Sequence, residues 1–330
     1  MPRRALVTGL SSFWGFRTAK QLVESGDFEL VVGVDSSPPP EPLDGLDYIR
    51  SDQSYSSLAR LVKRTEVDTI VHTFLVLSSA SISRRAMHEI NVIGTMNLLG
   101  AAGQSGSKVK QIVVKSSSLI YGSSFRDPTF FTETSPRAFS PRTEIERSLI
   151  EAEAYIQEFA EDKPHVDLCV LRFPNVIGPT VEADLSQALI RGVAPVVLGF
   201  DPLLQFVDEE EVLSVIRFVT GNSLSGVYNV SGDGRIPWSS VYTEAMARPL
   251  PISPLMSEQF TRLYQALGIA KVPRELIDLL RFGRGIDNRK LKNAGYEYGQ
   301  TTSEAVRSFA EYAASLRSEP PSIEEPKAII

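Results

Sequence analysis

A short turn bounded by two glycines is the first place in the chain where residue types and spacing predict chemistry. Gly9 follows an apolar run at 5–8, and Gly15 lies six residues further on, with Ser12 midway between them. Three glycines at these intervals let a strand turn tightly into a helix, bring a pyrophosphate close to the backbone and let the helix pack on the strand. The free N–H groups at the start of that helix then bind the phosphates. A serine at the middle position adds a Cβ, and its hydroxyl could compensate by a hydrogen bond. The same spacing also suits a plain strand–helix turn, so the glycines alone leave both interpretations open.

An aspartate after the next apolar run indicates which dinucleotide the turn would bind. Asp35 lies 20 residues after Gly15, directly behind a predicted strand at 30–34. A carboxylate at this place accepts hydrogen bonds from the adenosine ribose hydroxyls and repels a 2′-phosphate. Because Ser36 follows it rather than an arginine, the sequence favours NAD over NADP. The alternative is a solvated aspartate in a loop.

The elements that would position these residues alternate between strands and helices. Strands are predicted at 5–8, 30–34, 48–49, 69–72, 111–114 and 168–171, and helices at 13–25, 56–64, 82–102 and 144–161. This alternation is typical of parallel βαβ units. It predicts an α/β fold with a doubly wound, Rossmann-type parallel sheet that binds ligands at the carboxyl ends of its strands.

The pattern loosens after Pro179. Helices near 185–191, 209–219 and 273–282 mix with a short strand at 227–230. We therefore expect an NAD-binding domain over 1–179 and a smaller C-terminal α/β substrate lobe over 180–316, with some chain crossing back to the first domain. Residues 317–330 carry three prolines and three glutamates, and we expect a disordered tail there.

Composition excludes several classes of function. The net charge is −6 and no basic stripe occurs, so no nucleic-acid partner is expected. Cys169 is the only cysteine and lies in an apolar run, where a buried thiol is a simpler interpretation than a catalytic one. The histidines at 72, 88 and 165 lack metal-ligand spacing, so no metal is expected. Neither a membrane span nor a signal-peptide pattern is present, which predicts a cytoplasmic protein without a membrane partner.

Short motifs in a fixed order over almost the whole chain carry a resemblance to a known family. They are Val7-Thr8-Gly9, Gly33-Val34-Asp35, Asp52, the runs at 67–72, 91–99, 116–122 and 171–179, Gln205-Phe206-Val207-Asp208 and the run at 226–230. Together they resemble the extended short-chain dehydrogenase/reductases of the NAD-dependent epimerase/dehydratase group, of which UDP-glucose 4-epimerases are members. The segment at 198–207 resembles an atypical actinobacterial subgroup of that family.

The resemblance implies a set of residues that bind NAD. They are Gly9, Ser11, Ser12, Phe13, Trp14, Gly15, Asp35, Ser36, Asp52, Gln53, Thr73, Phe74, Leu75, Asn91 and Pro174. Asp52 would contact the adenine. Residues 73–75 stand where the family usually has alanines, so their bulk would tighten the nicotinamide side. For Asn91 a helix-stabilising side chain is an equal alternative.

A nucleotide sugar is the substrate that the resemblance implies. Its contacts would come from Ser117, Asn175 and Gln205. Asn175 corresponds to the position that meets the substrate pyrophosphate, and its alternative role is that of a turn residue.

The family reaction needs a serine, together with a tyrosine and a lysine at i and i+4 on one helix face. Ser117 fits the serine, four residues before Tyr121. The following helix contains no tyrosine–lysine pair at that spacing. We place Thr143 at the tyrosine position and Arg147 at the lysine position. Glu151 then falls where the family has its next glutamate.

A frame shifted to Ile145 and Leu149 fits the sequence less well. In either frame the usual acid/base is missing, and loss of such a group typically costs ~10²–10⁴ in rate. Tyr121 or an acidic residue of the helix could substitute. Two functions stay open: an NAD-dependent epimerase, dehydratase or reductase with an altered acid/base, or an NAD-binding protein without the usual epimerase turnover. We favour the second.

A homodimer is also expected from the resemblance. In the family, the helices that correspond to 82–102 and 143–161 pack across a dimer axis. The apolar positions Ile145, Leu149, Ala152 and Ile156 share helical spacing. They suit such an interface, and they could equally belong to the core.

Overall fold

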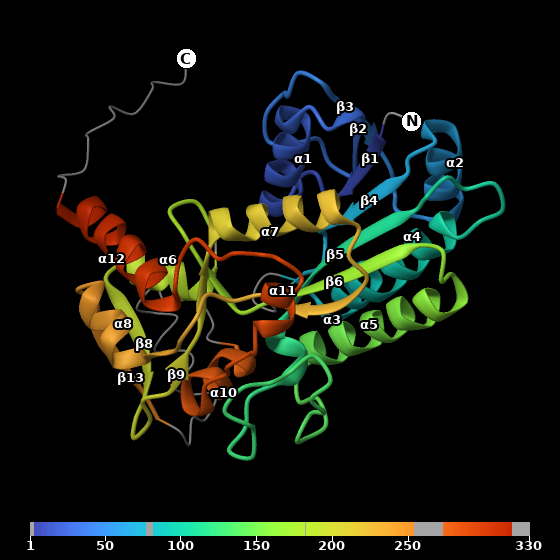
Figure 1. Cartoon of the computed structure of the whole chain (residues 1–330). Helices are drawn as coiled ribbons and strands as arrows, with labels where there is room; N and C mark the ends of the chain where they lie inside the picture. The colour runs from blue at the N-terminus through green and yellow to red at the C-terminus, as the bar shows by residue number, and fades with distance from the viewer. Residues whose placement is uncertain (1–2, 77–81, 182, 254–272, 319–330) are drawn as a thin grey trace.

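The computed structural model describes residues 3–76, 82–181, 183–253 and 273–318. Its centre is a seven-stranded parallel sheet in the order β11-β6-β5-β4-β1-β2-β3 (Figure 1). The strands are β1 (Arg3–Thr8), β2 (Phe28–Asp35), β3 (Leu46–Arg50), β4 (Thr69–His72), β5 (Gln111–Ser117), β6 (Asp167–Phe173) and β11 (Gly226–Asn229). The order reverses between β1 and β4, so the carboxyl ends of these two strands open a crevice for a ligand. The predicted α/β fold with a Rossmann-type sheet is confirmed.

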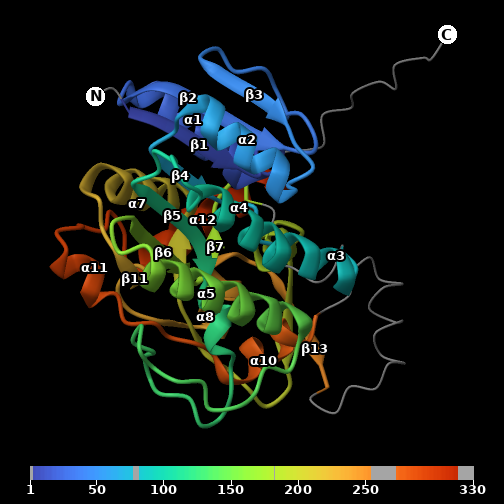
Figure 2. The same ribbon diagram turned by 90° about the vertical axis from the view of Figure 1, so that its right-hand side faces the viewer.

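Helices cover both faces of the sheet, which explains why its central strands are apolar on both sides. On one face, α1 (Phe13–Ser25) and α7 (Glu209–Asn222) pack through Leu22 and Val212. On the other face, α2 (Tyr55–Thr65), α4 (Thr95–Ala102) and α5 (Glu144–Asp162) pack through Leu58, Leu98 and Leu149. Figure 2 shows these last three helices lying along their face of the sheet.

The long helix predicted at 82–102 is not a single regular α-helix. It begins with α3 (Arg84–His88), passes through a π-helical segment, η1 (Glu89–Gly94), and ends with α4. Thr95 Oγ1 donates to the Asn91 carbonyl at 2.7 Å within this stretch. That side chain occupies an acceptor of the regular helical ladder, a disturbance that favours a local change of pitch.

A smaller lobe with its own apolar core lies beyond the carboxyl edge of the sheet, at the lower left of Figure 1. Its helices are α6 (Asp184–Ile190), α8 (Trp238–Glu244), α10 (Arg274–Phe282) and α12 (Thr302–Ser318). Its strands are β8 (Val193–Val197), which pairs with β13 (Arg248–Ile252), and β9 (Leu203–Leu204), which pairs with β12 (Ile236–Pro237). The chain crosses back to the main sheet at α7 and β11 and again at α11 (Arg289–Asn293).

Two short elements lie near the carboxyl edge of the sheet. The strand β7 (Asn175–Ile177) pairs with β10 (Phe206–Asp208), and a 3-10 turn, η2 (Ser118–Tyr121), follows β5. The strand β7 begins at Asn175, β10 follows Gln205 and η2 follows Ser117, the three residues that the sequence analysis assigned to substrate.

The tail predicted from residue 317 is wrong at its first two positions. Arg317 and Ser318 belong to α12, and the guanidinium of Arg317 donates to the carbonyls of Leu189 at 2.6 Å and Ile190 at 3.2 Å. These contacts hold the helix end on α6, which no local pattern indicated. Residues 319–330 lie outside the described residues. Within the described part of the chain, no helix is long and apolar enough to cross a membrane.

Gly15 gives a direct test of the packing between α1 and β1. A Cβ at this position would lie 2.0 Å from the Gly9 carbonyl oxygen. We expect Gly15→Ala to lower the free energy of unfolding by about 1–3 kcal/mol, because the backbone must move apart. The control is Gly221→Ala in α7, where a Cβ meets nothing within 4 Å. That change should be neutral or raise stability by up to ~1 kcal/mol. Equal melting temperatures for the two variants would contradict the close approach.

Candidate functional site

The turn between β1 and α1 is shaped by two close backbone approaches. Gly9 has φ of 73°, and a Cβ there would lie 2.6 Å from the Cβ of Phe74. Gly15 packs against the Gly9 carbonyl as described above. Side chains at either position would therefore push the turn away from β4 or α1 away from β1. The glycines are needed for the conformation and spacing of the turn.

Ser12, which stands where a third glycine was expected, is the N-cap of α1. Its hydroxyl donates to the Gly9 carbonyl at 2.6 Å and accepts from the Gly15 N–H at 3.1 Å. The side chain thus bonds within the turn and stabilises the start of the helix.

Asp35 lies at the end of β2 with only 6% of its surface exposed. One carboxylate oxygen accepts from both the backbone N–H and the hydroxyl of Ser11, each at 2.9 Å. The other accepts from the Ser36 N–H at 2.6 Å. The Ser36 hydroxyl lies 3.3 Å from that same oxygen, so all of the about four acceptor sites of an ionised carboxylate are used within the chain. A ribose hydroxyl would have to take the place of one of the serine hydroxyls. The turn and the end of β2 are therefore joined by one acidic side chain.

A cavity of about 730 Å³ opens over this turn. Eleven of the predicted cofactor residues line it: Gly9, Ser11, Ser12, Trp14, Asp35, Ser36, Asp52, Gln53, Thr73, Phe74 and Leu75. Sequence reasoning missed another seven lining residues, of which four come from η1: Ser54, Val76, Glu89, Ile90, Ile93, Gly94 and Asn97. Gly94 was within a quoted motif, and its lack of a side chain admits the Phe74 ring, 3.0 Å from an ideal Cβ.

A second cavity of about 360 Å³ shares Ser12, Trp14 and Leu75 with the first. It lies between the sheet and the smaller lobe, and its lining includes four predicted residues: Phe13, Ser117, Pro174 and Asn175. Asn175 also donates to the Gln205 carbonyl at 3.0 Å. The two cavities thus adjoin each other, with most of the predicted cofactor residues on the first and Phe13, Pro174 and Ser117 on the second.

Four ionisable residues of the second cavity were not predicted: Lys115, Asp184, Glu275 and Arg284. Arg284 donates to the Gly122 carbonyl at 2.8 Å and to the hydroxyls of two serines, Ser118 and Ser123. Burial is the main cause that lowers the pKa of its guanidinium, to about 10, so it stays charged at neutral pH.

Lys115 reaches the second cavity from β5. The residue is 2% exposed, and its Nζ lies 4.5 Å from the ring centre of Trp14 and 5.5 Å from that of Phe173. Burial lowers the pKa of its amine to about 7. Strand alternation could have found this residue, because positions i and i+2 share a face and Lys115 precedes Ser117 by two.

Three comparisons with known proteins bear on this site. Residues 5–231 match the model of the NAD dependent epimerase/dehydratase family. The chain belongs to this family. The Mycobacterium tuberculosis (strain ATCC 25618 / H37Rv) protein described as uncharacterized protein Rv0501 is 29% identical over 320 residues, which cover 93% of this chain and 83% of that protein.

Solved structures of other proteins show the same fold. A dTDP-glucose 4,6-dehydratase from Bacillus anthracis in complex with NAD has a TM-score of 0.72 at 18% identity, over 95% of this chain and 97% of that one. A UDP-glucose 4-epimerase from Thermotoga maritima with UDP-glucose has a TM-score of 0.71 at 20% identity, over 94% and 99%. MoeE5 in complex with UDP-glucose and NAD has a TM-score of 0.70 at 22% identity, over 96% and 100%.

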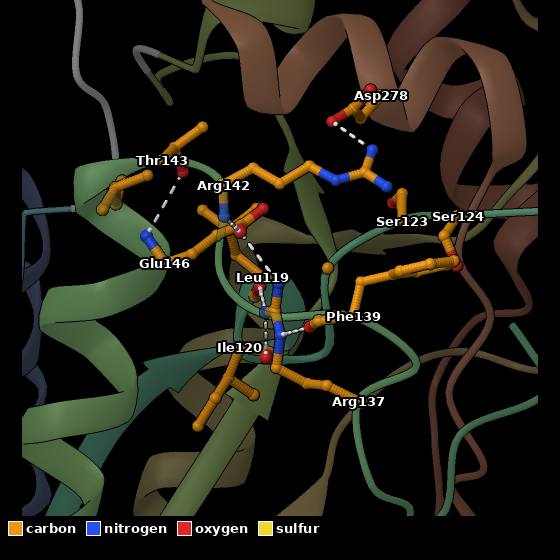
Figure 3. A network of polar contacts seen from close by, with 12 residues as sticks. Leu119, Ile120, Ser123, Ser124, Arg137, Phe139, Arg142, Thr143, Glu146 and Asp278 are labelled. Carbon is orange, nitrogen blue, oxygen red and sulfur yellow. Dashed lines mark hydrogen bonds and ion pairs between the residues drawn. The ribbon is translucent and has the colours of Figure 1, made fainter.

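The helix that should carry the family's tyrosine and lysine positions is α5. Thr143 is its N-cap, and its hydroxyl accepts from the Glu146 N–H at 3.4 Å (Figure 3). Arg147 is half exposed and pairs with Glu144 at 2.7 Å. Neither residue lines the two cavities. The assignment of Thr143 and Arg147 to these positions therefore does not fit the structure, because one side chain caps the helix and the other faces solvent.

The shifted frame fits the helix better. Ile145 and Leu149 do not line either cavity themselves, but both are 0% exposed and belong to the same apolar cluster as Leu75 and Leu119, which line the second cavity. Between them on the helix, Ser148 accepts from the Asn91 amide at 3.1 Å. Two aliphatic side chains thus occupy the inward i and i+4 positions.

Each frame also predicts a glutamate four residues after its lysine position. The burial of this glutamate favours the frame of Ile145 and Leu149. Glu153, four residues after Leu149, is 8% exposed and binds Arg172 at 2.5 Å and the Ser116 hydroxyl at 2.6 Å. Glu151, the partner of the other frame, is exposed and lies 3.7 Å from His88. The buried glutamate orients α5 on the sheet.

A separate polar network occupies the first turn of α5 (Figure 3). Glu146 is 2% exposed, and its carboxylate accepts from the Arg137 guanidinium and the Arg142 N–H, each at 2.8 Å. Arg137 also donates to the Phe139 and Ile120 carbonyls. The carboxylate of Glu146 thus binds groups of the loop before α5. It does not replace the missing acid/base of the family.

The side chains of Tyr121 and Gln205 make hydrogen bonds that connect parts of the fold. The Tyr121 hydroxyl donates to Asn229 at 2.8 Å and accepts from Arg172 at 2.7 Å, and burial is the largest cause that raises its pKa. Gln205 holds Ile286 through two hydrogen bonds of 2.7 and 3.2 Å. Neither lines the second cavity.

Asn91 and His72 support the wall of the first cavity. The Asn91 amide bonds both backbone groups of Val76, at 2.7 and 3.0 Å. His72 is wholly buried, and burial lowers its pKa to about 3, so the ring is neutral. Its Nε2 must donate to Thr95, whose own hydrogen goes to the Asn91 carbonyl.

The apolar positions of α5 do not support a dimer. Ile145, Leu149, Ala152 and Ile156 are at most 1% exposed within a single chain. They belong to the core, which was the alternative interpretation. Within the described residues, no group of three or more histidine, cysteine, aspartate or glutamate side chains could hold a metal ion.

Thr143 and Arg147 are tested by stability rather than activity. Thr143→Ala should lower the free energy of unfolding by about 0.5–2 kcal/mol, because α5 loses its N-cap. Arg147→Ala should change it by less than ~0.5 kcal/mol, as expected for an exposed pair. Both variants should bind NAD as the wild type does, measured by calorimetry. A large loss of NAD affinity in either variant would show that its residue contributes to the site after all.

Proposed function

We propose that this protein binds NAD in the cavity over the β1–α1 turn. The observation that carries the proposal is the turn itself, where a Cβ on Gly9 or Gly15 would collide with backbone or side-chain atoms. The start of α1 offers N–H groups to the pyrophosphate. Bound NAD would accept or supply a hydride at its nicotinamide.

Asp35 would select NAD over its phosphorylated form. Its carboxylate lines the first cavity, where the two ribose hydroxyls would take the place of the hydroxyls of Ser11 and Ser36 as its donors. A 2′-phosphate would meet this negative charge, and Ser36 offers no positive charge to offset it. The hydrogen bonds from Ser11 hold the carboxylate in place.

The second cavity would hold the substrate next to the nicotinamide. Its lining combines Ser117 and Asn175 with the positive charge of Arg284. A nucleotide sugar provides hydroxyls for the serine and a diphosphate for the cation. Among the similar structures, MoeE5 is described in complex with UDP-glucose and NAD.

We further propose that the tyrosine-dependent turnover of epimerases is lost. Ile145 and Leu149 stand at the inward i and i+4 positions of α5 and cannot ionise. An aliphatic group neither takes a proton from a sugar hydroxyl nor binds the nicotinamide ribose. The second candidate function is hydride transfer with a different acid/base, and the amine of Lys115 in the same cavity favours it.

Nucleotide selectivity is the first test. NAD should bind at least ~10-fold more tightly than NADP, equivalent to ~1.4 kcal/mol. Asp35→Asn should narrow that ratio because the repulsion is removed. Asp47→Asn is the control, since this exposed aspartate on β3 does not line the cavity. Titration calorimetry measures the affinities of all three proteins for NAD and NADP, and equal binding of the two by the wild type would overturn the assignment.

Turnover is the second test. The wild type should not interconvert UDP-glucose and UDP-galactose. The double change Ile145→Tyr/Leu149→Lys should produce measurable interconversion. Its rate should exceed the wild-type background by at most ~10²–10⁴-fold, the factor that a positioned acid/base contributes. The matched pair Thr143→Tyr/Arg147→Lys should produce none. An NAD-dependent rise in melting temperature checks that each variant is folded, and a gain only in the second pair would show that the helix frame is wrong.

A further inference from the structure

Lys115 is the one ionisable residue of the second cavity that stands on the same strand face as Ser117, within the described part of the chain. Residues two apart on a strand point to the same side of the sheet. Both side chains line the cavity. Lys115 therefore approaches the space beside Ser117 from the α1 side of the sheet, opposite to α5.

The surroundings of this amine are almost wholly aromatic. In the described residues it makes no hydrogen bond or ion pair, and its recorded partners are the rings of Trp14 and Phe173. The other charged groups of the cavity are Asp184, Glu275 and Arg284. On the neighbouring strand β4, His72 is neutral, as shown above.

A purely structural role for this lysine is disfavoured by its environment. Buried lysines are normally paired, because removing an ammonium from water is costly. The two aromatic faces compensate for only part of that cost. A methionine would fill a similar volume with no charge to bury. An unpaired lysine that lines a cavity is therefore better explained by chemistry in that cavity.

We propose that Lys115 is the group that exchanges a proton with the substrate hydroxyl in this site, in place of the tyrosine that α5 does not supply. The inference rests on the proposed binding of NAD. NAD, when bound, would accept the hydride of the substrate C–H bond. Lys115, as the neutral amine, would take the O–H proton while the C=O bond forms. In the reducing direction, its ammonium would return that proton to the carbonyl oxygen while the C–H bond forms again.

The burial of the amine suits this role. A pKa near 7 leaves comparable amounts of amine and ammonium at neutral pH, so the group can both take and give a proton. Oxidation needs the neutral amine, so its rate should rise with pH and level off above the pKa. An ordinary lysine would be almost wholly protonated over that range.

The decisive experiment follows NADH formation at saturating NAD with UDP-glucose, UDP-galactose and dTDP-glucose as probes. For the wild type we expect NADH from at least one probe, with a rate that rises through about pH 7. Lys115→Met and Lys115→Arg should each lower that rate by ~10²–10⁴-fold, because neither side chain cycles protons near neutrality. Lys110→Met, an exposed lysine immediately before β5, is the matched control and should behave as the wild type.

Failure of this proposal is distinct from failure of NAD binding. No NADH from any of the three probes, while calorimetry shows that NAD binds, would overturn the role of Lys115 and leave the binding function standing. Full activity of Lys115→Met, or an unchanged pH profile in that variant, would overturn it as well. Loss of NAD binding by the wild type would instead refute the proposed function.

A second readout needs no substrate. The unfolded chain keeps the ordinary lysine pKa of ~10.4, so burial of Lys115 destabilises the fold most below about pH 7 and progressively less as the pH rises toward ~10. Lys115→Met should therefore raise the melting temperature, and by more at about pH 6 than at about pH 9. Lys110→Met should show no such dependence. A pH-independent difference for Lys115→Met would mean that the amine titrates normally, which would overturn the proposal.

Discussion

Helix α1 begins in contact with the end of β1, and much of the site depends on that contact. An ideal Cβ on residue 15 would lie 2.0 Å from the Gly9 carbonyl oxygen, so the two segments meet at a distance that only glycine permits. The approach places the first N–H groups of α1 at the carboxyl edge of the sheet, where ligands of such folds bind. It also brings the Trp14 ring over Lys115. One backbone contact thus shapes the first cavity and part of the second.

The rotation of α5 about its axis decides what the second cavity contains. Glu153 binds Arg172 on β6 and Ser116 on β5, and Ser148 accepts from Asn91 on the π-helical segment. These contacts lie on the side of the helix that faces the sheet. Ile145 and Leu149 lie on that same side, so the ion pair that fixes the helix also turns two aliphatic groups inward. In the frame we propose, they take the places of the tyrosine and lysine of the family, and the polar contacts of the helix are present without its reacting groups.

Local patterns in the sequence predicted the sheet and the cofactor turn because the causes of both are local. Apolar runs define the central strands, and the spacing of Gly9, Gly15 and Asp35 follows from one strand–helix–strand unit. The frame of α5 was not predictable in the same way, since it depends on Arg172, a residue 19 positions beyond Glu153 on another strand. The end of α12 likewise depends on carbonyls of α6. A signal for Lys115 was present in the alternation of β5, but a single lysine in an apolar run does not reveal that its partners are rings.

Arg172 and Lys115 are cations on neighbouring strands of the sheet, and their surroundings differ. Arg172 on β6 lies on the α5 face, where a carboxylate and a tyrosine hydroxyl surround its guanidinium. Lys115 on β5 lies on the α1 face, and its pairing partner across the ladder is the apolar Leu171. The paired cation is held charged, since a buried ion pair with its hydrogen bonds filled compensates for lost hydration. The unpaired one has only ring faces to compensate it, so its proton is weakly held. The arginine can therefore only orient neighbouring elements, whereas the lysine is free to change its protonation state beside Ser117.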